Sequence, residues 1–155
     1  MGTLIVFLIA CYVVAGLGAK LTTPSLPWLA TLRKPAFNPP DRVFGPVWSL
    51  LYTLMAFSGW LVTDSPASAP RSLALTIFAV QLALNLLWSF LFFHLRRPGL
   101  ALVEIVLLLL AIWSYVAVAW HVNVLAAELF IPYGLWVAFA TVLNGSIWRL
   151  NARKS

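Results

Sequence analysis

Long apolar stretches, separated by short groups of charged or turn-forming residues, run through the whole chain. Five of them carry almost no charge, and they cover about residues 3–20, 43–63, 72–95, 99–119 and 128–149. An α-helix needs about 20 mostly apolar residues to cross the hydrocarbon core of a bilayer. The pattern therefore predicts an all-α integral membrane bundle of five transmembrane helices, forming a single domain over residues 1–155.

The composition supports a membrane protein. Of the 155 residues, 63% are hydrophobic and 9% are charged, whereas about a quarter of the residues in soluble domains are charged. Disordered chains are poor in apolar residues. A soluble domain and a disordered chain are therefore both excluded.

The basic residues predict the orientation of the bundle. With five spans, one side carries nine of the ten Lys and Arg residues, and the other side carries only Arg71. The nine are Lys20, Arg33, Lys34, Arg42, Arg96, Arg97, Arg149, Arg153 and Lys154. Because cytoplasmic loops carry the excess of Lys and Arg, we expect the N-terminus outside and the C-terminus in the cytoplasm. These side chains flank spans and face anionic headgroups, so the net charge of +6 requires no nucleic acid partner.

The connection over residues 20–42 differs in composition from its surroundings. It contains five prolines and two aromatic residues, which are Pro24, Pro27, Pro35, Pro39, Pro40, Trp28 and Phe37. Prolines restrict themselves and the residues before them to turn or extended conformations, so one continuous helix is not expected here. Long loops in compact bundles are usually functional. We expect a stiff lid over the cytoplasmic ends of the helices, with an inert spacer in the headgroup region as the alternative.

Residue types for catalysis or metal binding are sparse. His94 and His121 lie at span ends on opposite sides of the membrane, and no cluster of Cys, His or carboxylate residues has ligand spacing. We therefore expect no metal site and no resident cofactor. Glu104 is the one ionisable residue well inside a span. It suits either a proton-coupled transporter or a structural acid that is protonated or hydrogen-bonded.

Polar and aromatic residues inside three spans recur at helical spacing, which places them on one face. The three sets are Trp48, Tyr52 and Met55; Gln81, Asn85 and Trp88; and Pro132, Trp136, Ala140 and Asn144. Unpaired amides are costly in lipid, so these faces are predicted to point inward. Aromatic faces with a few polar groups suit a large planar apolar ligand. The alternative is a packed core, with Trp60, Trp120 and Trp148 forming an interfacial belt.

Four sequence blocks give the chain a family resemblance. They are Trp28 followed by Lys34-Pro35-x-Phe37-x-Pro39-Pro40; Gly45-Pro46-Val47-Trp48-x-x-Leu51-Tyr52; Gln81-Leu82-Ala83-Leu84-Asn85-x-x-Trp88, then Phe92-Phe93; and Pro132-Tyr133-x-x-Trp136-x-Ala138-Phe139-x-Thr141-x-Leu143-Asn144. Together they resemble the translocator protein family, also called peripheral benzodiazepine receptors or tryptophan-rich sensory proteins, over nearly the whole chain.

The resemblance implies a five-helix protein, in many members a homodimer, that binds porphyrins and other hydrophobic ligands under the first loop. Sterols and benzodiazepine-type drugs are further ligands of the family. Some bacterial relatives degrade protoporphyrin IX with light and oxygen, and the two tryptophans implicated match Trp48 and Trp136. The residues expected to contact ligand are Trp28, Phe37, Trp48, Tyr52, Asn85, Trp88, Trp136, Ala140, Leu143 and Asn144.

Three positions depart from the family pattern. Leu29 stands where a Tyr is frequent, and Phe37 stands where a Trp is common. Gly145 occupies the aromatic position of the cholesterol motif, which argues against high-affinity sterol binding. The missing cholesterol motif favours a bacterial-type member whose ligand is a tetrapyrrole. The charge asymmetry favours a bacterial cell membrane, although members of the family also occupy outer membranes of mitochondria and some bacteria.

Four functions remain open from the sequence. The leading one is a receptor, sensor or transport protein that binds protoporphyrin IX, haem-type porphyrins or other planar hydrophobic ligands. The alternative is an enzyme that degrades bound protoporphyrin IX photochemically, with Trp48 and Trp136 as the catalytic residues. A scaffold subunit and a proton-coupled exporter that depends on Glu104 complete the set.

Overall fold

The computed structural model describes residues 1–152, which form helices and their connections. The elements are α1 (Gly2–Thr22), a 3-10 turn (Thr23–Ser25), α2 (Leu26–Thr31), α3 (Asp41–Asp64), α4 (Ala69–Ser89), a π-helical turn (Phe90–His94), α5 (Pro98–Trp120) and α6 (Val124–Asn151). Five helical segments among these residues are long and apolar enough to cross a membrane. This confirms the predicted all-α, five-helix membrane architecture. Arg153 and Lys154, counted above among the basic residues, lie outside the described residues.

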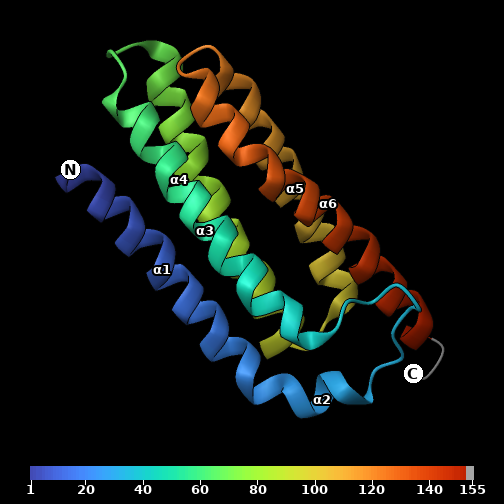
Figure 1. Cartoon of the computed structure of the whole chain (residues 1–155). Coiled ribbons are helices and arrows are strands. Elements are labelled where there is room, and N and C mark those ends of the chain that lie inside the picture. Colours follow the sequence, from blue (N-terminus) through green and yellow to red (C-terminus); the bar gives the residue numbers. More distant parts are fainter. Residues whose placement is uncertain (153–155) are drawn as a thin grey trace.

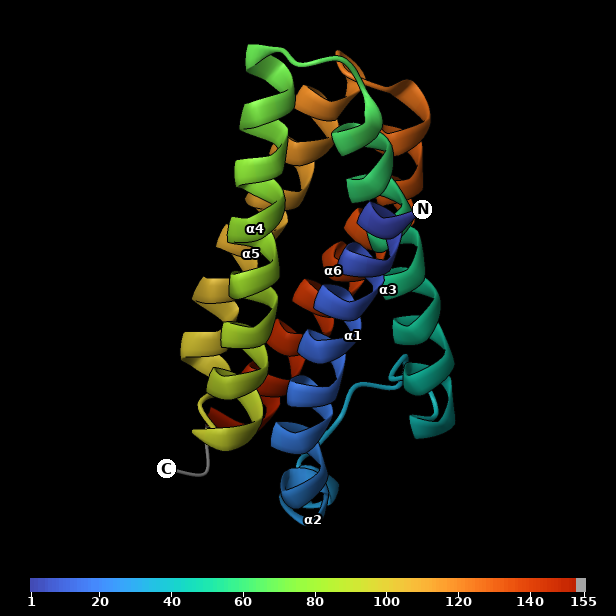
Figure 2. The same cartoon turned by 90° about the vertical axis from the view of Figure 1, so that its left-hand side faces the viewer.

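The five long helices pack around one another in a closed order. Around the bundle, α1 contacts α3, α3 contacts α6, α6 contacts α5, α5 contacts α4, and α4 returns to α1. Figures 1 and 2 show these helices running along a common direction, with α1 on the outside of the bundle. Cys11 is the one buried residue of α1, so α1 presents most of its apolar surface outward.

A close approach between helices fixes part of α1. The ring of Phe7 lies over Gly59 on α3, and a Cβ added at Gly59 would be 2.5 Å from Phe7 Cε1. The same ring makes an edge contact with Phe78 on α4, with ring centroids 5.3 Å apart. Gly59 is therefore needed because a side chain at this position would occupy the space of the Phe7 ring.

The two ends of the bundle differ in their connections. The short connections 65–68 and 121–123 lie at one end, which we call the hairpin end. The other end, which we call the loop end, holds α2, residues 32–40, the connection 95–97 and the last turn of α6 (Figure 1). The segment expected to form a lid, which comprises α2 and residues 32–40, therefore lies at the loop end.

The segment 20–42 contains more helix than its prolines suggested. Pro24 and Pro27 lie in the first turns of the 3-10 turn and of α2, where a missing backbone N–H leaves no helical hydrogen bond unmade. Only residues 32–40 lack helix, and they contain Pro35, Pro39 and Pro40. The prolines thus break the segment into short pieces rather than excluding helix from it.

The end of α4 departs from regular helix geometry. Phe90–His94 form a π-helical turn, in which Leu95 N–H donates to Phe90 O at 2.9 Å. Arg96 then adopts a positive φ of 53°, which is uncommon for a residue other than glycine. Single π-turns occur frequently at functional sites, and this one faces the loop end.

Candidate ligand-binding site at the loop end

A buried hydrogen-bonded chain connects α3, α4 and α6. Tyr52 Oη donates to Asn85 Oδ1 at 2.8 Å, and Asn85 Nδ2 donates to Tyr133 Oη at 2.7 Å. All three side chains are buried, with at most 6% exposed. The Asn85 amide therefore accepts a hydrogen bond from one tyrosine and donates one to another. These two bonds offset the free-energy cost of burying the amide among apolar side chains.

A second polar pair lies nearer the loop end. Trp88 Nε1 donates to Asn144 Oδ1 at 3.0 Å, and Asn144 Nδ2 donates to Pro98 O at 2.8 Å. The Pro98 carbonyl belongs to the first turn of α5. Asn144 therefore joins α4, α5 and α6 through one amide.

Aromatic rings lie next to these hydrogen-bonded groups, along the contact between α3 and α6. The Trp48 ring lies 5.7 Å from the Tyr52 ring and 6.3 Å from the Tyr133 ring. The Trp136 ring lies 5.8 Å from the Phe44 ring, one helical turn before Trp48 on α3. Both indoles are half-buried. They thus lie on one α3–α6 seam, with their rings in contact with other aromatic side chains.

Residues 32–40 and α2 pack over the loop end of this seam. The Phe37 ring lies 6.2 Å from the Phe139 ring. Asn151 on the last turn of α6 holds the backbone of Arg33 on both sides, since its Nδ2 donates to Arg33 O at 2.9 Å and its Oδ1 accepts from Arg33 N–H at 3.0 Å. Residues 33–37 therefore follow the last turns of α6.

The short helix α2 is attached to the π-helical turn. Trp28 makes an edge contact with Phe92, with ring centroids 6.0 Å apart, and the Arg96 guanidinium lies 5.9 Å from the centroid of the Trp28 ring. Ser25 Oγ donates to Phe93 O at 2.8 Å. The irregular backbone at the end of α4 thus provides a carbonyl and an aromatic surface on which α2 docks.

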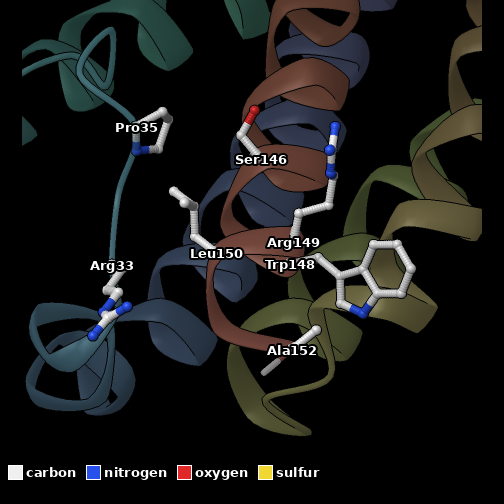
Figure 3. A pocket seen from close by; sticks show the side chains of 7 residues that line it. All are labelled: Arg33, Pro35, Ser146, Trp148, Arg149, Leu150 and Ala152. Atoms are coloured by element: carbon white, nitrogen blue, oxygen red, sulfur yellow. The ribbon is translucent and has the colours of Figure 1, made fainter. Parts of the chain in front are cut away.

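The described surface also carries a groove outside the aromatic site. It has a volume of about 810 Å³ and is lined by Arg33, Pro35, Ser146, Trp148, Arg149, Leu150 and Ala152. Figure 3 shows these side chains around the outer face of α6 and the adjoining loop. None of the residues predicted to bind ligand lines this groove.

Sequence comparison identifies the family. The profile described as the TspO/MBR family matches residues 6–149. The chain belongs to the TspO/MBR family.

Relatives from distant organisms agree with the family assignment. "Protein CrtK" of Rhodobacter capsulatus is 37% identical over 94% of this chain and 91% of its own length. "Translocator protein" of Homo sapiens is 41% identical over 81% of this chain and 76% of its own length. "Tryptophan-rich sensory protein" of Cereibacter sphaeroides is 36% identical over 94% of this chain and 89% of its own length. The names of the last two relatives match the resemblance derived from the four sequence blocks.

The TspO/MBR fold brings most of the predicted ligand residues to one end. Trp48, Tyr52 and Asn85 share one set of contacts, Trp88 and Asn144 share a second, and Trp136 contacts Phe44. Trp48, Trp88 and Trp136 all pack against the central core. Leu143 is buried in the loop-end cluster with Phe92, and Trp28 packs against that cluster. Ala140 packs on the central core, whereas Phe37 remains 49% exposed. These positions leave the ligand roles of the residues as predictions.

Sequence reasoning assigned no ligand role to four residues of this TspO/MBR site, although three of them, Phe92, Tyr133 and Phe139, stand in the family blocks. Tyr133 completes the hydrogen-bonded chain, while Phe44, Phe92 and Phe139 supply rings that contact the predicted tryptophans or Phe37. Tyr133 lies three residues before Trp136, which places both on one helical face. The helical spacing could therefore have found Tyr133, but ring contacts between distant segments are set by the tertiary structure.

Within the described residues, no group of three or more His, Cys, Asp or Glu side chains is arranged to hold a metal ion. The site consists of indole, phenol, phenyl and amide groups. Such a set can stack on an apolar ligand and orient it through hydrogen bonds.

Proposed function

We propose that this TspO/MBR protein is a membrane receptor or transport protein that binds tetrapyrroles and other planar hydrophobic ligands. The observation that carries the proposal is the convergence of Trp48, Trp88 and Trp136 with the buried amides Asn85 and Asn144 at the loop end. Protoporphyrin IX and haem-type porphyrins offer a large planar face for the indoles. The amides would then orient the macrocycle.

In this proposal, residues 32–40 and α2 act as a lid. The rings of the site contact one another in the ligand-free protein, so a macrocycle that stacks on them requires these rings and the lid to move. The contacts that hold residues 33–37 are the Asn151 amide and the Phe37–Phe139 ring contact. Both involve exposed groups, which makes them cheaper to break than buried contacts. Arg33, Lys34 and Arg42 belong to the segment beside this entrance and can attract the propionates of a porphyrin as it enters.

The proposed location is a bacterial cell membrane, with the loop end in the cytoplasm. The described basic residues of this end include Arg33, Arg42, Arg96 and Arg149, against Arg71 at the hairpin end. Membrane lipid is a proposed partner, and Gly145 still argues against high-affinity sterol binding. A homodimer stays a prediction, which the mass of the purified protein in detergent would check.

The test is a titration of the purified protein with protoporphyrin IX in darkness, followed by porphyrin absorbance and tryptophan fluorescence. We expect saturable binding that is weakened at least tenfold in Trp48→Ala/Trp136→Ala. The matched control is Trp60→Ala/Trp120→Ala, which removes two indoles from the hairpin ends of α3 and α5. Equal affinity in the two double variants would reject the assignment of the site.

An enzyme that degrades the bound porphyrin is the second candidate. It is favoured by the position of two oxidisable indoles, Trp48 and Trp136, on one α3–α6 seam in contact with other rings. The porphyrin would absorb the light and oxygen would be the co-reactant. Illumination should then bleach the Soret band faster with wild type than with Trp48→Phe/Trp136→Phe. Equal bleaching rates at equal occupancy would remove any catalytic role.

A further inference from the structure

Glu104 is a buried acid without a hydrogen-bond partner. The side chain is 5% exposed, and neither of its carboxyl oxygens has a hydrogen-bond partner within residues 1–152. The other acids of the chain, Asp41, Asp64 and Glu128, are exposed. Buried polar groups are normally hydrogen-bonded, and intramembrane acids usually mark functional positions. The Glu104 carboxyl is therefore a buried group that is free to form hydrogen bonds with a ligand.

The position of Glu104 places this group beside the candidate site. Glu104 is six residues after Pro98 on α5, or about 9 Å along the helix axis. The Pro98 carbonyl accepts from Asn144, whose side chain also bonds Trp88. Ala101, one turn before Glu104 on the same face of α5, is buried in the loop-end cluster with Phe92 and Leu143. The acid thus lies within the α4–α5–α6 part of the bundle that carries both polar groups of the site.

The neighbouring polar side chains are already bonded to one another. The Asn85 amide is held by Tyr52 and Tyr133, and the Asn144 amide is held by Trp88 and the α5 backbone. A ligand that used these amides would have to replace a bond within the protein. A hydrogen bond from the ligand to Glu104 replaces no bond within the protein, so its net contribution adds to affinity.

The chemistry of Glu104 defines what it can bind. Burial among apolar side chains favours the neutral carboxylic acid, which offers one O–H donor and one carbonyl acceptor. We propose that Glu104 is the interior hydrogen-bond anchor of the ligand site, donating its O–H to a carbonyl or carboxyl oxygen of a planar apolar ligand. This inference rests on the proposed function, and it adds a chemical requirement to it: the preferred ligand carries an oxygen acceptor.

Two porphyrins of similar shape test the requirement directly. Protoporphyrin IX dimethyl ester has carbonyl oxygens and no carboxylate charge, whereas etioporphyrin has no oxygen. We expect Glu104→Leu to lower the preference of the full-length protein for the ester over etioporphyrin by about tenfold. Glu104→Gln should restore the preference, because its carboxamide N–H can donate to the same oxygen.

A matched control separates the anchor from a general effect of buried polarity. Gln81 is 0% exposed, its Oε1 has no partner, and it lies one turn from Asn85 toward the hairpin end. We expect Gln81→Leu to leave the preference between the two porphyrins unchanged. A similar loss of preference in Gln81→Leu and Glu104→Leu would overturn the assignment to Glu104.

Thermal unfolding in detergent gives an independent result. Because the Glu104 side chain makes no hydrogen bond among residues 1–152, Glu104→Gln and Glu104→Met should be at least as stable as wild type. Glu104→Met also serves for the binding comparison if Glu104→Leu does not fold. A large loss of stability in all three variants would show a structural acid and overturn the proposal.

The outcomes for binding are also distinct. An unchanged preference in a Glu104→Leu protein that binds both porphyrins would refute the anchor and leave the proposed function intact. If the wild-type protein shows no saturable binding of the dimethyl ester, of etioporphyrin and of protoporphyrin IX, the proposed function itself is refuted.

Discussion

We call the part of the bundle nearer the hairpin end the hairpin half, and the part nearer the loop end the loop half. Both halves are rich in aromatic residues, but their side chains are packed differently. In the hairpin half, the Ser58 hydroxyl donates to Ala126 O at 2.7 Å and lies 2.8 Å from Tyr115 Oη. The Tyr115 and Phe130 rings have centroids 4.2 Å apart, and both side chains are completely buried. This half has the properties of a rigid core.

The loop half keeps much of its aromatic surface partly accessible. Trp28, Trp136 and Phe139 are half-buried, and Phe37 is 49% exposed. The contacts Trp28–Phe92, Phe37–Phe139 and Phe44–Trp136 are edge contacts at 5.8–6.2 Å, and Glu104 has no hydrogen-bond partner among residues 1–152. Displacing such groups exposes less new apolar surface than opening the hairpin half would. The difference indicates that one half holds the helices together while the other can rearrange around a ligand.

Truncating a ring in each half should show the largest difference. We expect Phe130→Ala to lower the free energy of unfolding by about 3–5 kcal/mol, because a completely buried ring leaves a cavity. Trp28→Ala should cost about 1–2 kcal/mol, because this ring is only half-buried. Denaturant unfolding in detergent micelles, followed by circular dichroism, would measure both values. Equal losses would contradict the division into a rigid and an adaptable half.

Filling the contact between α1 and α3 should have the next largest effect. In Gly59→Ala, the new Cβ would meet the Phe7 ring at 2.5 Å, so the ring or α1 has to shift at a cost of about 1–3 kcal/mol. Gly45→Ala is the matched control, because a Cβ there meets no atom within 4 Å. Of the two variants, Gly59→Ala should have the lower unfolding midpoint when both are measured in the same detergent. A smaller loss in Gly59→Ala than in Gly45→Ala would show that the close approach does not matter.

Removing one hydroxyl from the hydrogen-bonded chain of Tyr52, Asn85 and Tyr133 tests how much this chain stabilises the region between the two halves. Tyr133→Phe leaves the donor Nδ2 of Asn85 without its acceptor, which should cost about 1–3 kcal/mol of stability. Tyr12→Phe is the control, since Tyr12 Oη bonds Ser49 O and Thr53 Oγ1 in an exposed position. We expect its unfolding midpoint to stay near that of wild type. Equal shifts would mean that burial of the Asn85 chain adds nothing.

Releasing the loop should have the smallest effect on stability. Asn151→Ala removes both hydrogen bonds to the Arg33 backbone, and their exposure limits the loss to about 1 kcal/mol. The variant should instead bind and release porphyrin faster in stopped-flow measurements. Asn38→Ala is the control, because Asn38 Nδ2 bonds only the adjacent Pro39 O. Unchanged rates in Asn151→Ala would show that the Asn151 contact does not hold the lid.

Particular residues show how far the sequence could predict this site. Gln81, Asn85 and Asn144 were expected to face inward, and all three are buried, because a polar amide in a lipid-facing position has no partner. The partners themselves could not be predicted, since Tyr52, Asn85 and Tyr133 are far apart in the sequence. Pro132 was placed on an inward stripe with Trp136, but it is exposed, and Tyr133 is buried in its place.

The sequence by itself determined the membrane class, the number of spanning helices, the inward position of the amides and the family. These properties depend on apolar length, helical period and local motifs, which are written along the chain. Only the tertiary structure decided which side chains bond each other, how α2 docks on the π-helical turn, and that Glu104 has no hydrogen-bond partner among residues 1–152. The physical reason is that hydrogen bonds and ring contacts between helices depend on their relative register and rotation, which no single helix encodes.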